Sequence, residues 1–374
     1  MKILAQIITK YNADLSRVRL DEKQLKHYLY SKKIDKNGIP FDENTTKRHR
    51  IILALLSDKK VEDESIIVQL FKAEIKEHQS NVDQGLSASM SRNAFLLASF
   101  NRVEHLDLFI KANASNNDTF YEFNENFLLW NGIENSYKHI EKLNKKSQEF
   151  FYQKFGKTSA TCIYTDNDIQ NWKTKLSDYY ARFFKNENFE DEFHLLLDIE
   201  EKKAAQKLLS NWKKKQALKD DQYWKKLAKY YEYLNDFERQ IKAYKKLIQL
   251  SESKTEKLVY NISLADLYLQ QKDADGLLTC TTTYLSMKYK VKKLGIWLLT
   301  KVRNQCLAFI LLKNDKKNKD AIQLWNWLKP LLAKQKDLNH YQLEDIAKVY
   351  DLFGNDKKSK EYLQKAKQEK AKWN

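Results

Sequence analysis

The sequence predicts an all-α protein, and three observations lead to this prediction. The 374 residues include only 7 glycines and 2 prolines, far fewer than the turns of an all-β fold require. Apolar residues recur at the i, i+3, i+4 and i+7 spacing of a helix face through most of the chain. Aromatic residues form 13% of the chain, which supplies apolar surface for a core and argues against disorder.

The first 157 residues are expected to form an N-terminal helical domain. Helices are placed where the apolar spacing is helical, and connections where polar and turn-forming residues gather. The expected helical segments are residues 2–33, a helix capped by Thr45 or Thr46, a helix capped by Asp63 or Ser65, a pair within 91–112, and residues 120–143. The expected connections are residues 35–44, 78–87 and 113–118.

Residues 158–164 (TSATCIY) are the most strand-like run of the chain. One short strand cannot form a sheet alone, so this run is expected to connect two helices. It is also where we place the boundary between the N-terminal domain, residues 1–157, and a second region, residues 158–374. Helical patterns resume at Asp166 and continue through the rest of the sequence.

Residues 223–250 show the clearest pattern of the second region. Asn235 and Asp236, which tolerate turn geometry, separate two segments of helical spacing. The apolar face of the first segment consists of Trp224, Leu227, Ala228 and Tyr231, and that of the second of Phe237, Ile241, Tyr244, Leu247 and Ile248. The sequence therefore predicts an antiparallel helical hairpin here.

The spacing of this hairpin returns after 37, 43 and 39 residues. The returning residues are Leu264-Ala265-Tyr268, Leu307-Ala308-Leu311 and Ile346-Ala347-Tyr350. The pattern resembles the tetratricopeptide repeat, a helix-turn-helix unit of about 34 residues. Gly354 occupies the family's turn-glycine position, whereas Asn235 replaces that glycine in the first unit and Gln240 stands where the family has a small residue. A kink or break is expected at Pro330.

The resemblance covers the C-terminal half and implies degenerate helix pairs stacked into a solenoid. In the family, the first helix of each pair lines a concave groove, and lysines there often hold acidic peptide tails. The resemblance places in this groove Gln222, Lys225, Lys229 and Glu232 of the first unit and Tyr341, Glu344, Lys348 and Asp351 of the last. The candidate partner-binding residues are Gln222, Lys225, Lys229, Glu232 and Lys348. An ordinary solvated helix face is the alternative interpretation of Lys225 and Lys229.

The net charge of +17 is confined to the C-terminal half. Residues 200–374 contain 38 of the 67 basic and 21 of the 50 acidic residues, whereas the residues before them hold 29 of each. Such an asymmetry indicates an acidic partner, either a protein or a nucleic acid. Lysine-rich helix faces that serve only solubility would produce the same excess.

The sequence contains no motif for catalysis, cofactor binding or metal binding. The seven histidines lie apart from one another and from the cysteines, so zinc-ligand spacing is absent. Phosphate-binding glycine loops and hydrolase motifs are also missing. Cys162, Cys280 and Cys306 are far apart and are expected to be reduced thiols, the last two as small core residues. We therefore expect a protein that is not an enzyme and uses no cofactor.

The expected function is non-enzymatic binding of a protein partner. The scaffold and the charge asymmetry suit a bacterial immunity-type or regulatory protein that binds and neutralises or controls one acidic protein, such as a toxin. An RNA- or DNA-binding helical protein is the alternative, because lysines and aromatic residues mix in the C-terminal half. No segment reaches the roughly 18 apolar residues that a membrane span requires, and the thiols favour the cytoplasm.

Overall fold

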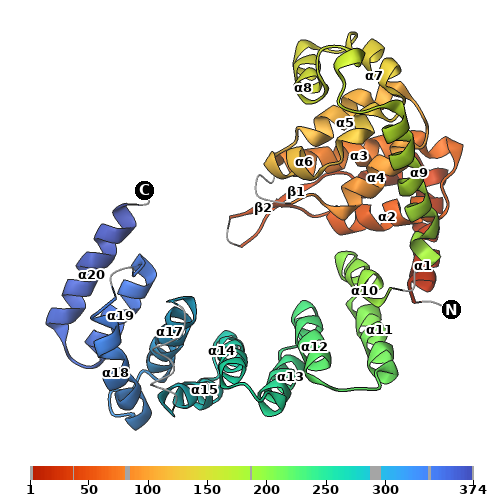
Figure 1. Ribbon diagram of the computed structural model, residues 1–374. Helices are drawn as coiled ribbons and strands as arrows, with labels where there is room; N and C mark the ends of the chain where they lie inside the picture. The colour runs from red at the N-terminus through yellow and green to blue at the C-terminus, as the bar shows by residue number, and fades with distance from the viewer. Residues whose placement is uncertain are drawn as a thin grey trace. The chain divides into compact units, whose positions relative to one another are not determined.

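The computed structural model describes residues 3–36, 38–80, 85–185, 188–286, 296–335 and 338–372. The described part is all-α apart from one short β-hairpin, as the sequence predicts (Figure 1). The chain divides into two compact units, Met1–Lys214 and Lys215–Asn374. The boundary predicted at residues 157/158 lies within unit 1, because the helix that follows it packs against earlier helices of that unit through Trp172 and Tyr180.

Unit 1 consists of helices and short 3-10 turns, labelled η, around an apolar core. Its elements are α1 (Ile3–Leu20), η1 (Glu22–His27), β1 (Lys32–Ile34), β2 (Pro40–Asp42), α2 (Thr45–Ser57), η2 (Val61–Asp63), α3 (Glu64–Ser80), α4 (Ala88–Ala98), η3 (Val103–His105), α5 (Leu106–Asn113), α6 (Asn117–Glu122), η4 (Glu125–Leu129), α7 (Ile133–Ile140), α8 (Lys145–Phe155), η5 (Ser159–Thr161), α9 (Asp166–Arg182), η6 (Phe183–Lys185), α10 (Phe189–Asp198) and α11 (Lys202–Lys215). As predicted, residues 158–164 connect two helices, α8 and α9.

A chain of aromatic rings joins the helices of unit 1. The ring centroids of Phe71 in α3 and Phe109 in α5 lie 5.8 Å apart, and those of Phe109 and Phe127 in η4 lie 5.7 Å apart. Trp172 of α9 meets Phe127 edge-on at 5.0 Å. Such ring pairs stabilise a core beyond the apolar area that they bury, so α9 belongs to this core.

Strands β1 and β2 form an antiparallel β-hairpin, whereas the sequence predicts helix up to residue 33 and a loop over residues 35–44. Lys32 pairs with Asp42 and Ile34 with Pro40. The carboxylate of Asp35 accepts a hydrogen bond from the Ile39 N–H at 2.8 Å and closes the turn. The prediction is wrong here because three-residue strands are too short to show an alternating pattern.

The single helical segment predicted over residues 120–143 is three elements, α6, η4 and α7. Asn124 begins η4 by accepting a hydrogen bond from the Asn126 N–H at 3.0 Å. Gly132 begins α7 with φ of +91°, which has no place inside a helix. The chain therefore turns twice, although its apolar residues keep a nearly helical spacing.

The connection predicted over residues 78–87 begins later than expected, because α3 continues to Ser80. His78 is buried, where an exposed loop residue was predicted from the polar sequence. Its Nε2 accepts a hydrogen bond from the Ser87 N–H at 3.2 Å, and its Nδ1 lies 2.9 Å from the Glu74 carbonyl oxygen. Two hydrogen-bonding partners thus offset the cost of burying this polar ring.

Unit 2 is a succession of antiparallel helix pairs, visible from green to blue in Figure 1. Its described helices are α12 (Asp221–Tyr233), α13 (Phe237–Leu250), α14 (Lys254–Gln270), α15 (Ala274–Ser286), α17 (Ile296–Lys313), α18 (Lys319–Leu332), α19 (His340–Leu352) and α20 (Asp356–Ala371). The hairpin predicted around Asn235 is confirmed as α12 and α13. Each pair also packs against the next. Helices α14 to α20 share one apolar core, and α13 packs against it through Ile241, Tyr244 and Ile248.

Three of the turns between paired helices share one backbone geometry. The residue at the turn has positive φ at Asn235 (55°), Lys272 (56°) and Gly354 (73°). The next N–H bonds to the carbonyl of a tyrosine five residues back: Asp236 to Tyr231 at 2.8 Å, Asp273 to Tyr268 at 2.9 Å and Asn355 to Tyr350 at 2.8 Å. This is the Schellman ending of a helix, in which asparagine can replace glycine. The missing turn glycine at Asn235 therefore does not disturb the hairpin.

Helix α18 continues past Pro330 to Leu332, so the helix does not break at Pro330. Pro330 removes one N–H donor from the helix, and the helix ends two residues later. Leu328 and Leu332 are both buried and hold this last turn against the core of unit 2.

Gly276 of α15 lies close against the ring of Tyr268 in α14. A Cβ atom there would lie 2.3 Å from the ring of Tyr268 in α14. We expect Gly276→Ala to destabilise unit 2 by about 1–2 kcal/mol, because displacing a packed ring costs more than the roughly 1 kcal/mol that alanine gains over glycine in a helix. Urea unfolding followed by circular dichroism measures the change. Thr282→Ala, at an exposed position of the same helix, is the control, and equal stabilities of the two variants would contradict the clash.

Candidate functional site

Four of the five predicted partner-binding residues lie along one stripe of α12. Gln222, Lys229 and Glu232 are exposed, and Lys225 is half-buried. The stripe lies beside the face that packs into the core, which consists of Tyr223, Leu227, Ala228, Tyr230 and Tyr231. The fifth residue, Lys348, is exposed on α19, the first helix of the last pair.

The lysines of this set already have partners within their own helices. The Lys225 ammonium lies 3.0 Å from the Asp221 carboxylate, and that of Lys348 lies 2.9 Å from Asp345. The hydrogen bond to the carboxylate raises the pKa of each lysine. Lys229 lies over the ring of Tyr233, 5.7 Å from its centroid. Exposed ion pairs of this kind contribute little stability, but they reduce the charge that this face presents.

The corresponding face of the middle pairs forms a polar joint between α14 and α17. Asp266 accepts hydrogen bonds from Lys301 at 3.1 Å and from the Gln305 amide at 2.6 Å. Gln305 is buried and also donates to the Ile262 carbonyl at 2.9 Å, while the Tyr284 hydroxyl donates to the Gln305 side chain at 2.6 Å. The joint fixes α17 against α14.

Two large aromatic residues of unit 2 are exposed, each at the start of the first helix of a pair. Trp297, the second residue of α17, is 66% exposed, and Tyr341, the second residue of α19, is 68% exposed. Lys301 lies 5.9 Å from the Trp297 ring centroid, and the His340 ring lies 3.9 Å from that of Tyr341. The resemblance to the repeat family predicts Tyr341 as a partner-facing residue, but it does not predict Trp297. Trp297 could have been found in the sequence because it lies outside the apolar stripe of its helix.

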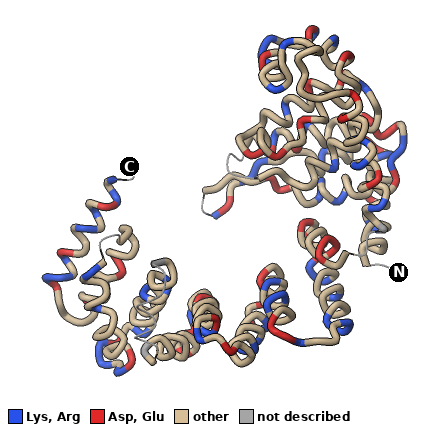
Figure 2. The backbone as a smooth tube through the Cα atoms, viewed as in Figure 1, with Lys and Arg blue, Asp and Glu red and all other residues tan. Residues whose placement is uncertain are grey.

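The positive charge excess lies largely on other helices, as Figure 2 shows for α11 and α20. The lysines of α11 are Lys202, Lys203, Lys207, Lys213, Lys214 and Lys215, and this helix has no acidic residue. Helix α13 carries Arg239, Lys242, Lys245 and Lys246 against Glu238 alone. Helices α12, α14 and α19 together are nearly balanced in charge. Helices α11, α13, α17 and α20 are basic, and α17 carries Lys301, Arg303 and Lys313 without an acidic residue.

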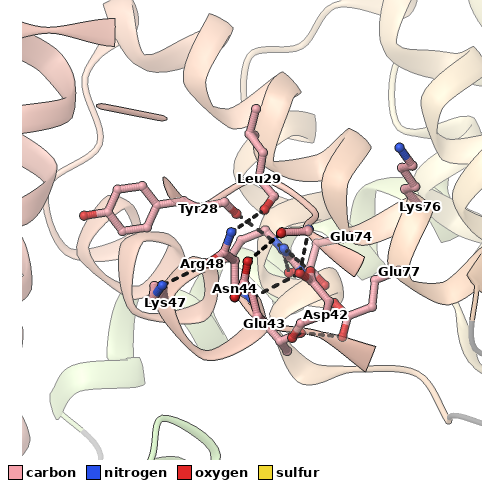
Figure 3. A network of polar contacts seen from close by, with 12 residues as sticks. Tyr28, Leu29, Asp42, Glu43, Asn44, Lys47, Arg48, Glu74, Lys76 and Glu77 are labelled. Atoms are coloured by element: carbon pink, nitrogen blue, oxygen red, sulfur yellow. Dashed lines mark hydrogen bonds and ion pairs between the residues drawn. The ribbon is translucent and has the colours of Figure 1, made fainter. Parts of the chain in front are cut away.

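Unit 1 contains a buried polar network centred on Arg48 of α2 (Figure 3). Its guanidinium contacts three buried carboxylates: Asp42 of β2 at 2.7 Å, Glu74 of α3 at 2.8 Å, and Glu77 of α3. Hydroxyl groups occupy further carboxylate oxygens, with Thr45 donating to Glu77 at 2.6 Å. The network fastens the β-hairpin to α2 and α3.

The network carries more negative than positive charge, because one guanidinium faces three carboxyl groups. Burial raises the pKa of Glu77 to about 7, and the neighbouring Glu74 carboxylate adds to the rise. One of the three carboxyl groups therefore exchanges its proton close to neutral pH. Every partner of this network is internal, which is typical of a structural core.

Metal-ligating side chains do not gather into a cluster within the described ranges. No group of three or more His, Cys, Asp or Glu side chains among those residues could hold a metal ion. Cys280 and Cys306 are core residues, as predicted, and burial raises the pKa of the Cys280 thiol to about 12. A thiol of this kind stays protonated and is a poor nucleophile. No helix in the described part of the chain is long and apolar enough to cross a membrane.

Comparison with known protein families, with curated proteins and with solved structures finds no match for this chain.

Proposed function

We propose that this chain is a non-enzymatic protein-binding scaffold, and that the first helices of unit 2 form the binding face. The observation that carries the proposal is the pair of exposed aromatic residues, Trp297 and Tyr341, at the starts of α17 and α19. We interpret the helix pairs as tetratricopeptide-like, so that α12, α14, α17 and α19 line the groove of such a solenoid.

The chemistry of this face suits a protein partner. Tryptophan and tyrosine are the residues that most often dominate the energy of protein interfaces. Lysines on the same two helices are paired with carboxylates, Lys301 with Asp266 and Lys348 with Asp345. A surface of aromatic residues with carboxylates beside its lysines offers a protein both apolar and polar contacts, and it attracts a nucleic-acid backbone less than the uniformly basic α11 would.

The basic helices outside this face have a different role in the proposal. A net charge of +17 creates a long-range field that speeds association with an acidic protein. A bacterial immunity-type or regulatory protein that controls an acidic toxin would use both features. The three unpaired thiols suit action in the reducing cytoplasm.

Affinity purification of the tagged chain from its native cells, after nuclease treatment, tests the proposal. We expect a stoichiometric acidic protein with the wild-type chain, and at least about a tenfold loss with Trp297→Ala/Tyr341→Ala, since each truncation of a central aromatic residue costs more than about 1 kcal/mol. Tyr121→Ala/Leu363→Ala removes exposed apolar side chains elsewhere and is the matched control. Equal recovery of the partner by both double variants would refute this binding face.

Binding of RNA or DNA is the second candidate function, and the six lysines of α11 favour it. A nucleic-acid-binding protein would lose its co-purifying material on nuclease treatment. It would also bind oligonucleotides with an affinity that falls steeply as salt rises. Absence of oligonucleotide binding at about 50 mM salt would remove this candidate.

A further inference from the structure

Unit 1 contains a polar cleft of about 940 Å³ that the proposed function does not use. Three segments distant in the sequence form its walls: residues 101–104 around the start of η3, residues 130–142 around α7, and α9. Its lining is dominated by basic and amide side chains: Arg102, Lys138, His139, Lys142 and Lys173, with Asn101, Asn131 and Asn135. Glu104 is the one carboxylate among the residues that line this cleft.

Helix α7 supplies one wall through its helical spacing. Asn135, Lys138 and His139 follow one another at i, i+3 and i+4 on α7, Lys142 lies two residues beyond the end of the helix, and all four line the cleft. The opposite face of α7 is buried in unit 1 and consists of Ile133, Ser136, Tyr137 and Ile140. The core of unit 1 therefore fixes the direction in which the basic face of α7 points.

In the described part of the chain, the lysines that line the cleft lack the carboxylate partners that Lys225 and Lys348 have in unit 2. Among the described residues, Lys138 and Lys142 have no carboxylate within ion-pair distance. Arg102 uses one nitrogen on Glu64 at 2.9 Å and remains 59% exposed at its side chain. The cleft thus gathers positive charge on a rigid frame, where a multivalent anion gains from several cations at once.

Among these cations, Lys173 gives the strongest indication that the cleft binds an anion. Its ammonium is half-buried and donates to the Trp130 carbonyl oxygen at 3.1 Å, lying 5.0 Å from the centroid of the Trp130 ring. Burial lowers its pKa, since no carboxylate compensates for the lost water. Burying a charge without a counter-ion is costly, and an anion in the cleft would offset that cost.

We infer that this cleft binds a small ligand that carries linked phosphate groups, such as the pyrophosphate part of a nucleotide. Cations on three walls match an anion with two or more charged centres better than a single phosphate. The volume lies in the range of small-molecule sites. Trp130 is buried, so its ring cannot stack on a base, and recognition rests on the phosphates.

Isothermal titration of the full chain with inorganic pyrophosphate, at about 50 mM salt, tests this inference. We expect saturable binding of one pyrophosphate, weakened at least about tenfold in Lys138→Glu/Lys142→Glu. Lys145→Glu/Lys146→Glu is the matched control, because it makes the same charge change at the start of α8, outside the residues that line the cleft. Circular dichroism establishes that each variant is folded.

The two variants separate a site from general attraction. Loss confined to the cleft variant supports the inference, whereas an equal loss in both variants, or no saturable binding to the wild-type chain, overturns it. A single-stranded oligonucleotide is the second probe, compared at equal phosphate concentration. Oligonucleotide binding tighter than pyrophosphate binding and lost in the cleft variant would assign the cleft to a nucleic-acid backbone and would overturn the small-ligand inference.

Discussion

Replacing Arg48 with methionine is expected to destabilise unit 1 by about 3–5 kcal/mol, the largest effect of any substitution considered for this protein. The guanidinium is fully buried against Asp42, Glu74 and Glu77, and each of these carboxyl groups is itself buried. Methionine would leave the three without a cation, and their mutual repulsion would no longer be opposed. A loss of this size is a large share of the 5–15 kcal/mol that typically holds a domain folded.

Urea unfolding followed by circular dichroism, with hydrogen exchange to locate the change in α2 and α3, measures this loss. Arg17→Met is the matched control, since Arg17 is exposed and paired only with Asp14 of the same helix turn. It should cost less than about 1 kcal/mol. Adding Asp42→Asn, Glu74→Gln and Glu77→Gln to Arg48→Met should recover part of the loss, because no buried charge then remains. An Arg48→Met protein as stable as the Arg17→Met protein would show that the network does not hold the hairpin.

The second large effect is a pH dependence of the stability that arises at Glu77. Burial and the charge of Glu74 raise the folded-state pKa of Glu77 from 4.5 to about 7. Between these values the folded state binds more protons than the unfolded state, so the free energy of unfolding falls as pH rises. The full contribution of one such group is up to about 3 kcal/mol.

His49 has the opposite effect, and the experiment must separate the two. Burial and the nearby Arg92 lower the pKa of His49, so its contribution to stability is lost as pH falls below its unfolded-state value of about 6.5. The quantity to measure is therefore the difference in unfolding free energy between the wild type and Glu77→Gln, at pH 5 and at pH 8, because His49 is common to both proteins.

The unfolding free energy of Glu77→Gln minus that of the wild type should increase by about 2–3 kcal/mol when the pH rises from 5 to 8. Glu149→Gln, on the exposed surface of α8, should show no such change. A difference between wild type and Glu77→Gln that stays constant with pH would mean that Glu77 is ionised throughout, and that Arg48 outweighs both burial and Glu74.

The sequence predicts helices well where the apolar spacing is long and regular. The hairpin around Asn235 and the core positions of Cys280 and Cys306 follow from that spacing. The β-hairpin at residues 32–42 escapes prediction because its strands are short, and Gly132 divides a segment whose spacing still looks helical. In these places a turn residue, and not the hydrophobic pattern, decides the structure.

The candidate sites differ in how far the sequence reveals them. The stripe that includes Lys225 and Lys229 lies on the single helix α12, so the helical spacing of the sequence predicts it. The ion pairs between neighbouring helices, such as Lys301 with Asp266, depend on tertiary packing and cannot be predicted from the sequence. The same holds for the basic cleft of unit 1, where Arg102 and Lys173 lie far apart in the chain and meet only in the fold.

We propose that a protein partner binds the first helix of each pair in unit 2. Lysine acetylation of the chain, alone and in complex with the co-purified protein, tests it most directly, because exposed lysines lie on both first and second helices. Binding should protect Lys229 of α12 and Lys348 of α19, while Lys242 of α13 and Lys367 of α20 keep their reactivity. Protection of Lys242 and Lys367 with unchanged reactivity of Lys229 and Lys348 would contradict the claim.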